Sequence, residues 1–134
     1  MAGEAHDAKA TFVKNIQRVE GHLREGQYGA CARTANEMAR FSCLLGQAAW
    51  VFVSEVLESV FENMYHLSSS HGLPAEDERH MRPKLSQAVN DVLHAIANGE
   101  DDKILQPLMQ LRFVATELQM RVWTGEPRIQ GDAN

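Results

Sequence analysis

Histidine and acidic side chains gather in the middle of the chain, and these are side chains that bind metal ions. Glu62 and His66 stand one helical turn apart, and His71 and His80 belong to the loop region that follows. Zinc binds three or four such groups where they converge. Loop ligands have no fixed spacing here, however, and a polar helix end followed by a solvated loop contains the same residue types. A polar surface is therefore the favoured interpretation, and a zinc site is the alternative.

Two glutamates, Glu55 and Glu58, lie close together on the same predicted helix. Paired carboxylates that face an acid on another helix hold magnesium for phosphate chemistry. Their spacing resembles part of the motif of all-α nucleoside triphosphate pyrophosphohydrolases of the MazG type, in which Glu-x-x-Glu on one helix precedes Glu-x-x-Asp on the next. Asp91 matches the end of the second half, but Ala88 stands where its glutamate should be. The resemblance implies a degenerate pyrophosphohydrolase with a magnesium site, whereas the favoured interpretation is a solvated stripe on a mostly buried helix.

Three arginines of the first half of the chain, Arg18, Arg33 and Arg40, form a candidate site for an anion or a phosphate group. The competing interpretation is local ion pairing between residues four apart on a helix. The pairs with this spacing are Glu20–Arg24, Arg33–Glu37 and Glu117–Arg121. Because the chain is acidic overall, surface pairing is favoured over an anion site.

No set of residues for nucleophilic catalysis is recognisable. Cys31 and Cys43 lie in apolar helical surroundings, where a thiol behaves as a small hydrophobic group. The sequence contains no glycine-rich phosphate loop, nucleophile elbow, HExxH or CxxC pattern. We therefore expect a protein that is not an enzyme and has no cofactor, with Mg²⁺ or Zn²⁺ chemistry as the alternative.

The elements that must position these residues have helical periodicity, and no segment alternates as a strand does. Helices are predicted over residues 7–25, 30–68, about 83–98 and about 101–124, with Asp7 as the first cap, Pro83 opening the third helix and Gly125 ending the last. Residues 68–77 form a central loop, and residues 1–6 and 124–134 form loosely ordered tails. Residues 1–134 are thus expected to form one all-α domain, an antiparallel bundle of four or five helices.

The second predicted helix is unusually long, and Gly46 is its only internal breaker. Either it breaks near Gly46, which typical helix lengths favour, or it projects into a dimer partner. The predicted inward faces are Phe12, Ile16, Val19 and Leu23; Cys31, Ala35, Met38 and Ser42, continued by Leu45, Ala49, Phe52, Val56, Val60 and Met64; Leu85, Val89, Val92 and Ile96; and Ile104, Leu108, Leu111, Ala115, Leu118 and Val122. The stretch around Gly46 is apolar on all sides and should be buried in a bundle centre or a dimer interface.

Residues 23–45 resemble the opening of HEPN domains, in which a first helix, a turn with Gly-x-Tyr and a small-residue helix carrying glutamate follow one another. The matching residues are Gly26, Tyr28, Ala32, Ala35 and Glu37. HEPN ribonucleases also carry an arginine followed four to six residues later by a histidine, a spacing that is missing here. The resemblance therefore implies a non-catalytic or nucleotide-associated HEPN-like member rather than a nuclease.

Composition sets limits on the function. The chain of 134 residues has 44% hydrophobic and 23% charged residues, as globular domains do, and a net charge of −5 that disfavours DNA binding. The N-terminus has no basic region before an apolar core, and the longest apolar stretch, residues 41–53, is too short to span a membrane. We expect a cytoplasmic helical-bundle module that acts by self-association, as a dimer, or by binding a protein partner. The exposed-looking Trp123 near a helix end supports this expectation.

Overall fold

The computed structural model describes residues 2–124, with side chains from residue 7 to residue 123. This part of the chain is helical almost throughout and contains no strand, so the predicted all-α fold is confirmed. The elements are α1 (Ala2–Arg24), α2 (Tyr28–Leu44), α3 (Ala48–Ser70), α4 (Ala75–Ala97), the short 3-10 helix η1 (Asp101–Lys103) and α5 (Leu105–Thr124). None of these helices has both the length and the apolar character that crossing a bilayer requires.

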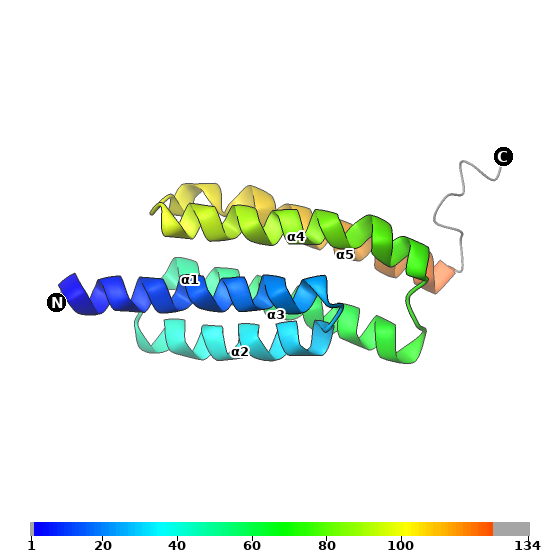
Figure 1. Cartoon of the computed structure of the whole chain (residues 1–134), viewed down its shortest axis with the longest axis horizontal. Coiled ribbons are helices and arrows are strands. Elements are labelled where there is room, and N and C mark those ends of the chain that lie inside the picture. The colour runs from blue at the N-terminus through cyan, green and yellow to red at the C-terminus, as the bar shows by residue number, and fades with distance from the viewer. Residues whose placement is uncertain (1, 125–134) are drawn as a thin grey trace.

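The five α-helices close into a ring. α1 packs against α2 and α4, α3 packs against α2 and α5, and α4 packs against α5. Successive helices run in opposite directions, so α3 and α5 are parallel neighbours (Figure 1). The inward faces predicted for α1 and α4 are buried, and Phe12 stacks on Trp50 across the ring interior with 4.8 Å between ring centroids.

The predicted second helix, residues 30–68, breaks at Gly46, the alternative that typical helix lengths favoured. Gly46 has φ of +68°, a left-handed conformation that glycine adopts without strain. The Gly46 N–H donates to the Cys43 carbonyl and the Gln47 N–H donates to the Ser42 carbonyl, each at 3.0 Å, which closes α2 with the Schellman pattern. The chain therefore reverses, and α3 packs back along α2.

Across this break the predicted buried face is confirmed only in part: Val56, Val60 and Met64 on α3 are buried as predicted. On α2 the predicted residues Cys31, Ala35, Met38 and Ser42 are all buried. Leu45 and Phe52, however, are exposed, and Leu44 at the same turn is 89% exposed. The reversal at Gly46 rotates α3, so the inward face of α3 begins at Trp50 and Val53 instead. The apolar stretch around Gly46 thus lies at an end of the bundle and not at its centre.

Several predicted boundaries were also wrong. α1 begins at Ala2 rather than after a cap at Asp7, so residues 2–6 are helical and not a loose tail. α3 continues to Ser70 and α4 begins at Ala75, which shortens the central loop to residues 71–74. α4 runs through Pro83, because Met81 and Leu85 on either side are held in the core. Thr124 ends α5, and the predicted stop at Gly125 and the rest of the C-terminal tail lie outside the described residues.

Candidate functional site

The residues predicted to bind zinc do not come together. Glu62 Oε1 and His66 Nε2 are 3.8 Å apart on the surface of α3, and both side chains are exposed. His71 follows the end of α3, whereas His80 lies on α4 with its side chain exposed. In the described part of the chain, no three His, Cys, Asp or Glu side chains are grouped as a metal ion would require.

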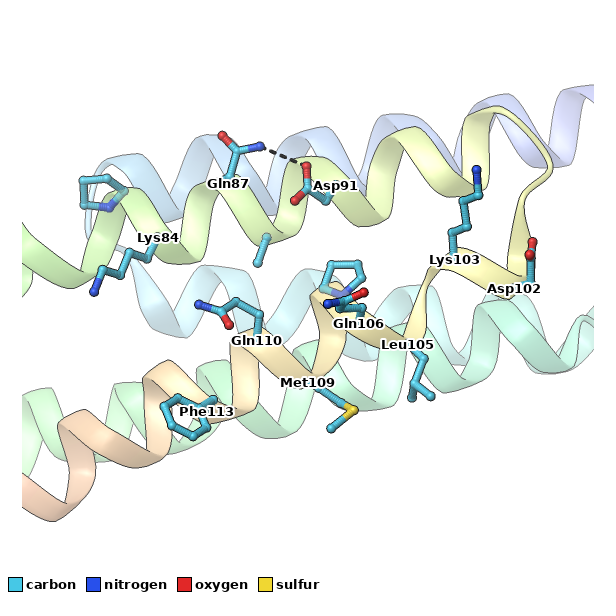
Figure 2. Close-up of a pocket in the computed structure, with 13 residues that line it drawn as sticks. Lys84, Gln87, Asp91, Asp102, Lys103, Leu105, Gln106, Met109, Gln110 and Phe113 are labelled. Carbon is cyan, nitrogen blue, oxygen red and sulfur yellow. Dashed lines mark hydrogen bonds between the residues drawn. The ribbon is translucent and has the colours of Figure 1, made fainter.

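The alternative magnesium residues are also separated. Glu55 and Glu58 line a shallow hollow on α3, and Glu58 accepts a hydrogen bond of 2.7 Å from the Asn36 amide of α2. Asp91 lies on α4, where it accepts a hydrogen bond of 2.9 Å from Gln87 and lines a groove between α4 and α5 (Figure 2). The two glutamates and Asp91 therefore belong to different surfaces.

The three arginines of the candidate anion site are exposed and engage different neighbours. Arg18 donates to Asn15 one turn earlier on α1, at 3.4 Å. The Arg33 guanidinium lies over Gly29 on its own helix, and Arg40 is exposed near the other end of α2. Of the three predicted local pairs, Glu20–Arg24 and Glu117–Arg121 form. Surface pairing therefore accounts for Arg24 and Arg121, and an anion site at Arg18, Arg33 and Arg40 stays a prediction.

A polar cluster that the sequence did not predict joins α1, α2 and α4. The hydroxyl of Tyr28 on α2 donates a 2.7 Å hydrogen bond to Glu78 Oε2 on α4, and the Arg82 guanidinium donates to the same oxygen at 2.6 Å. Arg82 also donates to the Arg24 carbonyl at the end of α1, at 3.2 Å. We call Tyr28, Glu78 and Arg82 the interhelical latch, because they tie the α1–α2 turn to α4.

The latch shifts the proton affinities of its members. Burial raises the pKa of Tyr28 well above its ordinary value, and the adjacent Glu78 carboxylate raises it further because it favours the neutral phenol that donates to it. Burial lowers the pKa of Arg82, but its hydrogen bonds to Glu78 and Tyr28 outweigh that effect and raise it. Both groups thus keep their donor protons across the physiological pH range. The two donors therefore hold the latch together as a structural connection near neutral pH.

The most distinctive surface feature is an apolar row along α5. It consists of five large side chains on the solvent side of the helix, each between 53% and 69% exposed. These are Leu105, Met109, Phe113, Met120 and Trp123. The opposite side of α5 carries the predicted inward residues Leu108, Leu111, Ala115 and Leu118, which are buried as expected, as is Ile104 just before the helix. The last predicted inward residue, Val122, is only partly buried. α5 is thus apolar on two faces, of which the bundle covers one.

The groove between α4 and α5 borders this row. Figure 2 shows Gln110 pointing toward α4, and Leu105 and Met109 pointing away from it. Lys84, Gln87 and Asp91 form the α4 wall of the groove. The groove thus carries three polar side chains beside Pro83 and Ala88 on its α4 side, and Leu105, Met109 and Phe113 of the apolar row line it from α5.

Comparison of the chain with protein-family models, with curated proteins and with solved structures finds no match. The site must therefore be interpreted from its own chemistry. Sequence reasoning found Trp123 but missed the rest of the row. The available signal was a second series of apolar residues on α5 with the same spacing as the inward series, displaced around the helix.

Proposed function

We propose that this protein is a non-catalytic helical-bundle module that associates with a second copy of itself through the outer face of α5. One observation carries the proposal: Leu105, Met109, Phe113, Met120 and Trp123 form an exposed row that is apolar apart from Thr116, which stands between Phe113 and Met120. Single exposed apolar residues are common on protein surfaces, but a contiguous row rimmed by polar groups is typical of an interaction site. A helix with one face in its own bundle and one apolar face outside it is suited to pack against another helix.

The area of the row is sufficient for a specific dimer. Each of the five side chains exposes more than half of its surface, and with roughly 200 Å² for a large side chain the row offers about 600 Å². Two copies would then bury about 1,200 Å², which is near the lower end of specific protein interfaces. Methionine and aromatic side chains, which make up four of the five, are also enriched at the centres of such interfaces.

Two expectations from the sequence accompany this proposal: membership of a HEPN-like family and a cytoplasmic location. A HEPN-like member without the arginine–histidine motif of the nucleases would have a non-catalytic role, and residues 23–45 carry that resemblance. A cytoplasmic location is the second expectation. Both stay predictions.

Sedimentation of a double variant tests the proposal. Met109→Ser combined with Phe113→Ser removes the middle of the row, and both positions are exposed, so the fold of each copy should be unaffected. We expect the wild type to be dimeric and the variant monomeric over concentrations from about 1 μM to about 1 mM, a range that spans moderate to weak association. The matched control is Leu44→Ser with Leu45→Ser, which removes two exposed apolar side chains at the α2–α3 turn and should stay dimeric.

Trp123 gives an independent measurement, because Trp50 is buried and Trp123 is exposed. Quenching of Trp123 fluorescence by acrylamide should weaken as the protein concentration rises and the row becomes covered. A wild type that stays monomeric with a fully quenchable Trp123 at every concentration would contradict the proposal. A double variant that dimerises as well as the wild type would do the same.

A further inference from the structure

The apolar row has the spacing of a coiled-coil seam. Met109, Phe113, Thr116, Met120 and Trp123 follow one another at intervals of four, three, four and three residues. Residues with this alternation occupy the a and d positions of heptads, which pack against the same positions of a second helix. The seam runs from Met109 to Trp123, which is roughly 21 Å at 1.5 Å per residue. Its occupant should therefore be a helix that presents the same spacing, and α5 of a second copy does.

The two flanks of the seam carry opposite charges. Arg112, just before Phe113, is exposed on the flank toward α3 and makes no hydrogen bond or ion pair to any described residue. Glu117, just after Thr116, lies on the flank toward α4. Glu117 accepts a hydrogen bond from Arg121 through Oε2, which leaves its other carboxylate oxygen for a second donor. In heptad terms Arg112 occupies a g position and Glu117 the e position of the following heptad.

We propose that two copies associate with their α5 helices parallel and in register, and that Arg112 of each copy pairs with Glu117 of the partner subunit. This inference rests on the proposed function and specifies the geometry of the same surface. In a parallel pair the g position of one helix lies opposite the e position of the next heptad on its partner, so two symmetric Arg112–Glu117 pairs flank the seam. The Thr116 hydroxyls meet at the middle of the seam, where each can accept a hydrogen bond from the other.

An antiparallel pair would lack this complementarity. There each flank faces the same flank of the partner, so Arg112 would lie opposite Gln119 or a second Arg112 and would find no carboxylate. Glu117 would lie opposite Gln110 or a second Glu117. Like charges across an interface disfavour an arrangement, and opposite charges fix its register. The charge pattern therefore selects the parallel dimer.

Cysteine cross-linking separates the two arrangements. In a Cys43→Ser background, which removes the exposed native thiol, Met109→Cys and Thr116→Cys are oxidised with diamide. In the parallel dimer both residues face their own counterparts within disulfide range, so both variants should form covalent dimers. In an antiparallel dimer centred on Thr116, residue 109 would lie roughly 20 Å from its counterpart, and only Thr116→Cys would cross-link.

The possible outcomes distinguish this inference from the proposed function. Cross-linking of both variants supports the parallel arrangement. Cross-linking of Thr116→Cys alone overturns the arrangement but leaves self-association through α5 intact. If neither variant cross-links although the wild type is dimeric by sedimentation, the parallel arrangement fails, and the Met109→Ser, Phe113→Ser variant then decides whether α5 is the interface at all.

A charge exchange tests the ion pairs directly. Arg112→Glu and Glu117→Arg should each raise the dissociation constant of the dimer by about two- to thirtyfold, because each change breaks both symmetric ion pairs. The exchanged double variant should recover most of the affinity, because it restores opposite charges. Glu117 also pairs with Arg121 in its own copy, so the decisive quantity is the coupling between the two changes. A double variant no better than the product of the single effects would overturn the pairing.

Discussion

The interhelical latch makes a prediction about stability that can be worked through from its contacts. Tyr28 is only 3% exposed, and its hydroxyl donates to Glu78. Tyr28→Phe removes that hydroxyl and leaves Glu78 with Arg82, so it should lower the free energy of unfolding by about 1.5 kcal/mol, the low end for a hydrogen bond to a charged group. Glu78→Ala leaves a buried hydroxyl and one donor of Arg82 without their acceptor. Its cost should be about 2 to 4 kcal/mol.

The double variant is the informative measurement. Once Glu78 is removed, Tyr28→Phe removes an unsatisfied hydroxyl rather than a hydrogen bond, so its own cost should fall close to zero or become favourable. We therefore expect the double variant to lose about 1 to 2 kcal/mol less than the sum of the two single variants. For a chain of this size, 1 kcal/mol corresponds to roughly 4 °C in Tm.

Urea unfolding followed by circular dichroism measures these differences. All variants should carry Met109→Ser and Phe113→Ser and be compared at one protein concentration, because self-association would otherwise add to the apparent stability. Glu55→Ala, at an exposed position on α3, is the control and should change stability by less than about 0.5 kcal/mol. Single effects that add to within about 0.3 kcal/mol would refute the hydrogen bond between Tyr28 and Glu78.

Two further predictions concern glycine and cysteine positions. Gly26 has φ of +72°, and an added Cβ would lie 2.8 Å from the Arg82 guanidinium, so Gly26→Ala should lower the free energy of unfolding by about 1 to 3 kcal/mol. Gly21 lies inside α1 with open space around it, so Gly21→Ala should raise the free energy of unfolding by about 0.5 to 1 kcal/mol. Equal effects of the two changes in thermal unfolding would contradict this prediction. Burial raises the pKa of the Cys31 thiol to about 12. Between the ordinary pKa of a thiol and pH 12, the unfolded chain therefore binds fewer protons than the folded one. The free energy of unfolding should fall as pH rises through this window, by up to about 1.4 kcal/mol per pH unit. Cys31→Ala should make this alkaline decline shallower, and iodoacetamide should modify Cys43 well before Cys31 in the folded protein; identical pH profiles or equal labelling rates would refute the assignment.

The inward faces could be predicted from the sequence because they depend on helical period alone. Phe12, Ile16 and Val19 recur at spacings that place them on one side of any regular helix. After Gly46 the same argument held for Val56, Val60 and Met64 but not for Leu45 and Phe52. The chain reverses at Gly46, and the sequence does not state the angle of that reversal. Pro83 was placed at the start of a helix for a similar reason: proline suits a first turn, and only the burial of Met81 and Leu85 shows that α4 continues through it.

The candidate site could likewise be predicted from the sequence only in part. The row that contains Met109 and Phe113 has the same spacing as the buried row of α5, so periodicity alone cannot tell which row faces the core. The packing of α3 and α4 against one side of α5 makes that distinction. The members of the metal and magnesium sets lie on different helices or past a helix end, and spacing along the chain does not determine whether such residues meet.

By itself the sequence determined an all-α chain, the helical segments and most inward faces, because these follow from local spacing and from the conformational freedom of glycine. The tertiary structure alone decided the closed ring, the exposed row of α5 and the latch between Tyr28 and Glu78, which are 50 residues apart. Contacts of that kind depend on how helices are placed relative to one another, and that placement is set by the packing of the whole core rather than by any local stretch of residues.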